Sequence, residues 1–476
     1  MEGKNLDRFR NILRTAFQEM QSSVEQYKAD GKSLGVIRDY PSFQGYQPNG
    51  MPRVGVNWYF RDSPDYMSPF SLTDSEGKIN VEKIKPMQQL KKYVDEEYEQ
   101  FATAPCFMNL DLRTDDGFWV LEVVILTMFD SYMHRRETKD FDESAFSSVT
   151  EQAFIRIFDE SLPVSICVPI LLVQFPEKPF DISSGLRIRR LSENELVSAA
   201  YAFNPHSGKD ESQLLTCASH ILEIHNIAIQ NTYFFSDSVY DCSEGYPREI
   251  IDIIDLWFVS LQIIKHFTFG YGAVMAIPHG WGIREGGFLE IHGAKMQKYP
   301  DLYLPKYWPN VPRTTVTAEE LERTSRLFSF LFDNDNHSLE LAAKRLFTAS
   351  LRANQEDAIL DLVIGIEALT TDNEKGDTTY KVSMRSAYMT SCLPEYPYDI
   401  IQTKDAVSTL YSYRSAVAHG RTPKEKEKTI LMADGKKLQA VEFAAELLRF
   451  LILSIERTPD FLDVKKVDQY LLRQHE

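Results

Sequence analysis

The sequence predicts an α+β protein, with a mixed α/β N-terminal region followed by a C-terminal all-α helical bundle. Three observations support this prediction. The chain has 476 residues, more than one ordinary core requires. Alternating and continuous apolar runs typical of strands lie in the first 337 residues. From about residue 338 a helical apolar period replaces them. We therefore expect three domains, at 1–160, 161–337 and 338–476.

The composition is that of a globular protein. Hydrophobic residues make up 43% and charged residues 25%, which excludes a wholly disordered or collagen-like chain. The net charge of −17 argues against a protein that coats nucleic acid through its overall charge. A local basic site stays open, because the acidic excess lies in the N-terminal region and the C-terminal region is nearly neutral.

The cysteine pattern and the apolar runs indicate the compartment. The five cysteines are widely spaced and form no C-x-x-C pair, so neither a disulfide framework nor a zinc ribbon is supported. No apolar signal segment follows Met1, and no run approaches the ~20 apolar residues of a membrane helix. We expect a cytoplasmic protein without a membrane partner.

The N-terminal third reads mainly as helices. Residues 5–28 carry an apolar stripe at every third or fourth position, typical of a helix docked on its own domain or of a short coiled-coil partner. Helices are also expected at 81–101 and 145–159, and a strand at 104–113. Residues 117–134 suit either a buried strand or a helix. Between the first two helices, 34–75 read as loops around a strand near 54–60.

The middle third is mixed. The apolar run 164–175 contains Pro169 and follows Pro163, so it predicts a broken or edge strand. Residues 186–191 alternate as a strand does, and Ser192 is placed to cap the next helix. A further helix is expected at 247–266.

The C-terminal region reads as a bundle without strand signals. The polar stretch 333–336 is the expected boundary. Five helices are expected at 338–352, 355–369 after an Asn354 cap, 380–391, 398–419 and 436–457.

The strongest motif closes the fourth of these helices. Arg414 and His419 form an Arg-x4-His pair, and Gly420 suits the left-handed position that follows a helix. The partial negative charge of a helix C-terminus favours a cation at His419. Glu367 is the one acid within the apolar portion of the second helix, and a buried acid needs a partner. Arg414 is the natural candidate.

These residues lead to a family resemblance. Arg345-Leu346, then Asp357, Asp361 and Glu367 on one helix, then Tyr-x2-Arg-Ser-x3-His-Gly resemble the HEPN superfamily, in particular the Apea-like HEPN domain of bacterial anti-phage proteins. The resemblance is specific over about residues 338–457 and fainter over 160–337. It implies metal-independent RNA cleavage by Arg414 and His419, with Glu367 and Ser415 in support. HEPN relatives often have Asn, Asp or His at the position of Ser415.

Physical chemistry is consistent with that implication. Attack by a ribose 2′-OH needs a proton acceptor or donor, and such help from a histidine contributes ~10²–10⁴ in rate. An arginine offers a fixed, always-charged fork for phosphate oxygens. Positions five apart on a helix point ~140° apart, so one copy does not easily aim both groups at one phosphate. A two-fold homodimer brings a second copy of each.

Five further cations are candidate RNA ligands. They are Arg345, Arg352, Arg385, Arg421 and Lys424. A solvated helix face explains Arg345 and Arg352 equally well. The segment 421–428 alternates with glutamates, so it favours a solvated loop.

Other sequence patterns give weaker indications of a functional site. His220, Glu223 and His225 do not have H-E-x-x-H spacing and indicate packing rather than a metal. No cofactor motif occurs, so we expect neither metal nor cofactor. Glycine-rich 279–287 indicates a loop.

The functional expectation is an HEPN endoribonuclease that acts as an anti-phage effector in abortive infection. Its partners would be RNA, with tRNA one candidate, a second copy of the chain, and a phage-derived trigger sensed by the N-terminal region. The alternative is a non-catalytic HEPN module that dimerises and binds RNA or protein.

Overall fold

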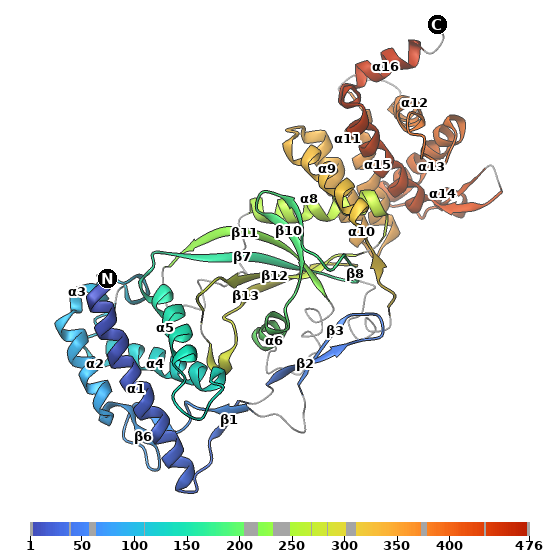
Figure 1. The fold of residues 1–476 in the computed structure, drawn as a ribbon. Coiled ribbons are helices and arrows are strands. Elements are labelled where there is room, and N and C mark those ends of the chain that lie inside the picture. Colours follow the sequence, from blue (N-terminus) through green and yellow to red (C-terminus); the bar gives the residue numbers. More distant parts are fainter. Residues whose placement is uncertain are drawn as a thin grey trace.

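The computed structural model describes residues 3–37, 40–56, 63–108, 110–203, 218–231, 248–267, 269–282, 284–300, 311–372, 378–432 and 435–473. The N-terminal helices, a central sheet and the C-terminal bundle follow one another along the molecule (Figure 1). The predicted α+β class, with a mixed N-terminal region and a helical C-terminal region, is confirmed.

The N-terminal part is a helical layer with short strand pairs. Its elements are α1 (Gly3–Ala29), β1 (Gly35–Ile37), β2 (Pro41–Tyr46), β3 (Pro52–Val56), β4 (Ser63–Asp65), β5 (Phe70–Ser71), β6 (Ile79–Asn80), η1 (Val81–Lys83), α2 (Lys85–Glu96), α3 (Tyr98–Ala102), η2 (Pro105–Phe107), α4 (Asp115–Arg135) and α5 (Glu143–Phe158). Phe9 and Phe17 of α1 pack against aromatic rings of α2, α4 and α5. The helix expected at 5–28 is therefore docked on its own domain.

Two predictions for this part are resolved by burial. Residues 117–134 are helical: Thr114 caps α4, and apolar side chains are buried around most of the helix, which explains the ambiguous pattern. The strand predicted at 104–113 is wrong. Pro105 begins the short η2 helix, and Cys106, Phe107 and Leu112 are buried in the core of the N-terminal helices instead of in a sheet.

A six-stranded antiparallel sheet forms the centre. Its order is β13 (His292–Lys298), β12 (Tyr271–Pro278), β7 (Ser161–Ile170), β11 (His220–Gln230), β10 (Leu186–Arg190) and β9 (Phe180–Ser183). Of the two alternatives for the run 164–175, the broken strand is confirmed, because β7 ends at Ile170 and β8 begins at Val173. The edge position is wrong, because β7 lies between β12 and β11. Its prolines are tolerated since the ladder with β12 covers only residues 164–167, between Pro163 and Pro169.

Helices cover both faces of this sheet. Further elements here are β8 (Val173–Gln174), α6 (Glu193–Ala202), α8 (Arg248–Lys265), η5 (Glu285–Gly287) and β14 (Thr314–Thr315). Alternate residues of β7 point to opposite faces, as strand geometry requires. Ile166 and Val168 pack toward α8, whereas Cys167 packs with Leu196 of α6. Ser192 caps α6 with a capping box, as predicted for this position.

The C-terminal part is the predicted bundle with additions. It contains α9 (Ala318–Asp333), α10 (His337–Leu351), α11 (Gln355–Thr370), α12 (Thr378–Ser391), α13 (Ile400–Ala418), α14 (Glu425–Lys428), β15 (Thr429–Leu431), β16 (Lys437–Gln439), α15 (Ala440–Arg457), η7 (Pro459–Leu462) and α16 (Val464–Arg473). The five expected helices are present. The β15–β16 pair was not expected, because three-residue strands leave too short an alternation to recognise.

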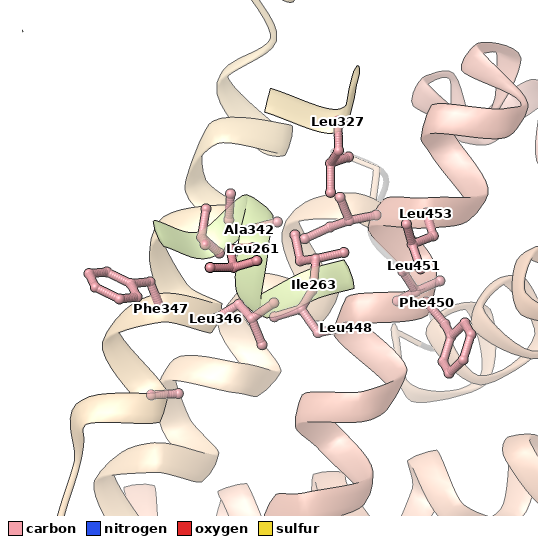
Figure 2. Close-up of a cluster of buried hydrophobic side chains, with 14 of the residues drawn as sticks. Leu261, Ile263, Leu327, Ala342, Leu346, Phe347, Leu448, Phe450, Leu451 and Leu453 are labelled. Atoms are coloured by element: carbon pink, nitrogen blue, oxygen red, sulfur yellow. The ribbon is translucent and has the colours of Figure 1, made fainter. Parts of the chain in front are cut away.

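One hydrophobic core runs from the sheet into the bundle. Figure 2 shows Leu261 and Ile263 of α8 among side chains of α9, α10 and α15, including Leu448. All of these side chains are buried. A separate core, from Phe9 to Ile157, lies in the N-terminal helices.

Candidate functional site

The Arg-x4-His motif lies at the C-terminal end of α13. Asp399 caps the other end of this helix, where its carboxylate accepts a hydrogen bond from the Gln402 amide (2.8 Å). The helix ends at His419, the C-cap residue, and Gly420 follows in the left-handed region with φ +66°. The Gly420 amide donates to the Val417 carbonyl and the Arg421 amide to the Ala416 carbonyl, both at 2.9 Å.

This hydrogen-bond pattern is a Schellman motif, which fixes the backbone at His419. The His419 side chain is exposed at the helix end, and Ser415, one turn earlier, is also exposed. An imidazole in this position is reachable by a ligand without any movement of the bundle.

Arg414 points differently from His419. It is half-buried, and its Nε atom is buried without a hydrogen-bond partner. The ~140° between positions five apart separates the two side chains around the helix axis. Arg414 and His419 therefore share one helix end, where helix geometry separates them around the axis within a single copy.

The expected direct pairing of the supporting acid, Glu367, with Arg414 is not formed, and the two residues instead both act on a tyrosine. Glu367 is half-buried on α11, and among the described residues it forms no direct ion pair with Arg414. Tyr411, one turn before Arg414, has a buried hydroxyl without a hydrogen bond of standard geometry. The pKa of Tyr411 is raised well above its ordinary value by burial and then by the Glu367 carboxylate, while Arg414 acts to lower it.

Tyr411 therefore belongs to the site together with Arg414 and Glu367. Sequence reasoning gave it no role, although the three-residue spacing between Tyr411 and Arg414 already placed them on one helix face. The half-buried Arg414 and Glu367, which both act on the Tyr411 phenol, form a polar cluster of α11 and α13.

Two of the candidate RNA ligands share one acid. Arg345 Nη1 lies 2.5 Å from Asp361 Oδ1, and Arg352 Nε lies 3.0 Å from Asp361 Oδ2. Asp361 is buried, whereas the arginine side chains are 37% and 45% exposed. Two guanidinium groups against one carboxylate leave an excess positive charge at this surface.

The other candidates have different surroundings. Arg385 is buried and pairs with Asp372 and Asp468, both at 2.7 Å, so its guanidinium joins α12 to α16. Arg421 forms a two-pronged pair with Glu427, and Lys424 is exposed nearby. Arg421 and Lys424 lie in the loop directly after His419 and are the first two cations that follow it in the chain.

The weaker histidine pattern is not a metal site. His220 packs against Phe175, and Glu223 pairs with Arg187 and Arg189. Within the described part of the chain, no three His, Cys, Asp or Glu side chains cluster as metal ligands would. Nor does any helix of that part have the length and apolarity needed to cross a membrane.

In comparisons with known proteins, no family model, no curated protein and no solved structure matches this chain.

Proposed function

We propose that the protein is a metal-independent endoribonuclease of the HEPN type that acts as an anti-phage effector. The observation that carries this proposal is the end of α13: an exposed histidine on a backbone held by a Schellman motif, five residues after Arg414. In this proposal His419 transfers the proton of the ribose 2′-OH or of the leaving oxygen. Arg414 stabilises the negative charge of the phosphorane.

The separation of the two side chains supports a composite site. In one copy Arg414 is directed into the bundle, and His419 is at its surface. A two-fold pair of α13 ends brings two copies of each residue together. In this proposal Glu367 supports Arg414 electrostatically from the neighbouring helix α11. Exposed Arg421 and Lys424 supply charge for the RNA backbone.

Cleavage of total RNA and tRNA in EDTA tests the proposal, with and without lysate of phage-infected cells. We expect wild-type cleavage to fall at least ~100-fold in Arg414→Ala and His419→Ala. Arg414→Lys should recover little, because lysine lacks the planar fork.

The matched controls are Arg326→Ala and His337→Ala, which replace an exposed arginine and an exposed histidine elsewhere in the C-terminal part. They should cleave as the wild type does. Cleavage that persists in folded Arg414→Ala, or that requires a metal, contradicts the proposal. A folded dimer that binds RNA without cutting it favours the non-catalytic module.

A further inference from the structure

A cavity of about 870 Å³ lies where the sheet region meets the helical bundle. Its walls come from α8, from Lys298 of β13, from the end of α9 with the connection 333–336, and from α10. Figure 1 shows α8, α9 and α10 meeting at this junction. This volume is within the range of pockets that enclose a small ligand or a few side chains.

The floor of the cavity is apolar. Ile253 and Leu256 of α8 are only half-buried there. Phe332, at the end of α9, is 55% exposed at the rim. Its ring stacks on Phe328 with 5.7 Å between centroids, which orients it. An exposed ring beside half-buried aliphatic side chains favours an apolar group that would remove this surface from water.

Some acids of the cavity are already paired with lysines of the cavity. Lys344 of α10 lies 3.2 Å from Asp252 of α8 and 2.8 Å from Glu340. Lys298 lies 3.0 Å from Asp255. These two ammonium groups therefore face three carboxylates.

Three more acids line the cavity without such partners. Glu249, Asp333 and Asp335 are exposed, and among the described residues none of them forms an ion pair. With these, six carboxylates face two ammonium groups. The excess negative charge surrounds an apolar floor, so the complementary ligand is cationic at its ends and apolar between them.

We propose that this cavity binds a short peptide segment in which apolar side chains are flanked by lysine or arginine. The apolar side chains cover Phe332 and Leu256, and the flanking cations pair with Asp333, Asp335 and Glu249. An acidic ligand is repelled by the same rim. This binding does not depend on the nuclease proposal, because it uses neither Arg414 nor His419.

Fluorescence anisotropy of the full chain with the labelled tetrapeptide Lys-Phe-Leu-Lys tests the proposal, at physiological ionic strength. We expect saturable binding, and at least tenfold weaker binding of Glu-Phe-Leu-Glu and of Lys-Ser-Ser-Lys. In the protein, the double substitution Asp333→Lys with Asp335→Lys should weaken the binding of Lys-Phe-Leu-Lys at least tenfold. Both positions are exposed, and a lysine suits the C-terminal end of α9, so folding should persist.

The matched control is Glu76→Lys with Glu99→Lys, which makes the same charge change at exposed positions of the N-terminal region. It should change the affinity less than twofold. Phe332→Ser, which keeps every charge, should weaken binding at least fivefold.

Three results would overturn the proposal. The first is an equal loss of affinity for Lys-Phe-Leu-Lys in the two double charge variants, which would mean that the peptide is attracted to the acidic surface in general. The second is unchanged affinity in folded Phe332→Ser, and the third is equal binding of Lys-Ser-Ser-Lys, because both would mean that the apolar floor is unused.

Discussion

At the residue scale, the partner of each charged side chain decides its role. Arg385 was a candidate RNA ligand, yet it is buried between Asp372 and Asp468 and joins two helices. Removing one member of such a buried pair typically costs ~3–5 kcal/mol. Arg345 and Arg352 keep exposed surface, because a single carboxylate serves both. Their residual charge is open to an anionic ligand, whereas that of Arg385 is not.

His220 is predicted to make the protein sensitive to mild acid. The pKa of His220 is lowered to about 4 by burial and by Arg313 and Arg190. In the unfolded chain His220 takes up a proton near pH 6.5, whereas in the folded protein it does so only near pH 4. The stabilising contribution is therefore complete above pH 6.5 and is lost as pH falls toward 4, by about 3 kcal/mol.

Denaturant unfolding at a series of pH values measures this effect. His220→Gln, which cannot be protonated, should flatten the pH dependence of the free energy of unfolding between pH 6.5 and 4.5. The control His337→Gln replaces an exposed histidine and should leave the wild-type slope. An unchanged slope in folded His220→Gln would disprove the assignment.

At the element scale, close helix packing depends on one glycine. Gly365 of α11 faces α15, where an added Cβ would lie 2.6 Å from Leu448 Cδ2 and 3.3 Å from Arg345 Cβ. Alanine is the better helix former by ~1 kcal/mol, but overpacking costs ~1–3 kcal/mol. Packing should prevail at this position, because Leu448 is fully buried and has little room to move.

Gly365→Ala should therefore lower the free energy of unfolding by up to ~2 kcal/mol, despite the gain in helix propensity. Denaturation of Gly365→Ala, Leu448→Ala and the double variant forms a double-mutant cycle. We expect the double variant to lose less than the sum of the single losses, because a smaller side chain at 448 admits the new methyl group. Additive losses would show that the two residues do not compete for space.

At the scale of the whole molecule, the two largest hydrophobic cores of the described residues lie in different parts of the chain. The first lies in the N-terminal helices, and the second continues from the sheet into the bundle. The joint between the N-terminal helices and the sheet region is partly polar. Buried Asp130 of α4 accepts a hydrogen bond from the Gly286 amide (2.6 Å), and the Tyr40 hydroxyl donates to the Gly286 carbonyl (2.8 Å). Two regions joined by a polar interface unfold less cooperatively than two regions that share an apolar core.

Calorimetry of the full chain should therefore show two transitions. Leu261→Ala in α8 and Leu448→Ala in α15 remove buried side chains from the same core. Both should therefore shift the same transition to lower temperature, with a loss of ~2–5 kcal/mol each in its free energy of unfolding. Phe17→Ala should shift the other transition to lower temperature, with a loss of ~3–5 kcal/mol in its free energy of unfolding. If the Leu261 and Leu448 variants shift different transitions, the sheet and the bundle unfold independently.

Local features of the fold were predictable because their causes are local. The caps at Ser192 and Asn354 and the left-handed Gly420 follow from side chains and backbone freedom within a few residues. The expected helices of the bundle follow in the same way from apolar spacing. The strand predicted at 104–113 failed because the same apolar residues serve a helical core equally well.

The sequence by itself determined the α+β class, the helical C-terminal region and the position of Arg414 and His419 at a helix end. Only the tertiary structure decided that β7 is central, that Arg385 is buried, and that Glu367 and Arg414 both act on the pKa of Tyr411. The cavity between the sheet and the bundle was also invisible in the sequence. The physical reason is common to all four: strand neighbours, ion-pair partners and cavity walls come from residues distant in the chain, and their meeting depends on packing rather than on local spacing.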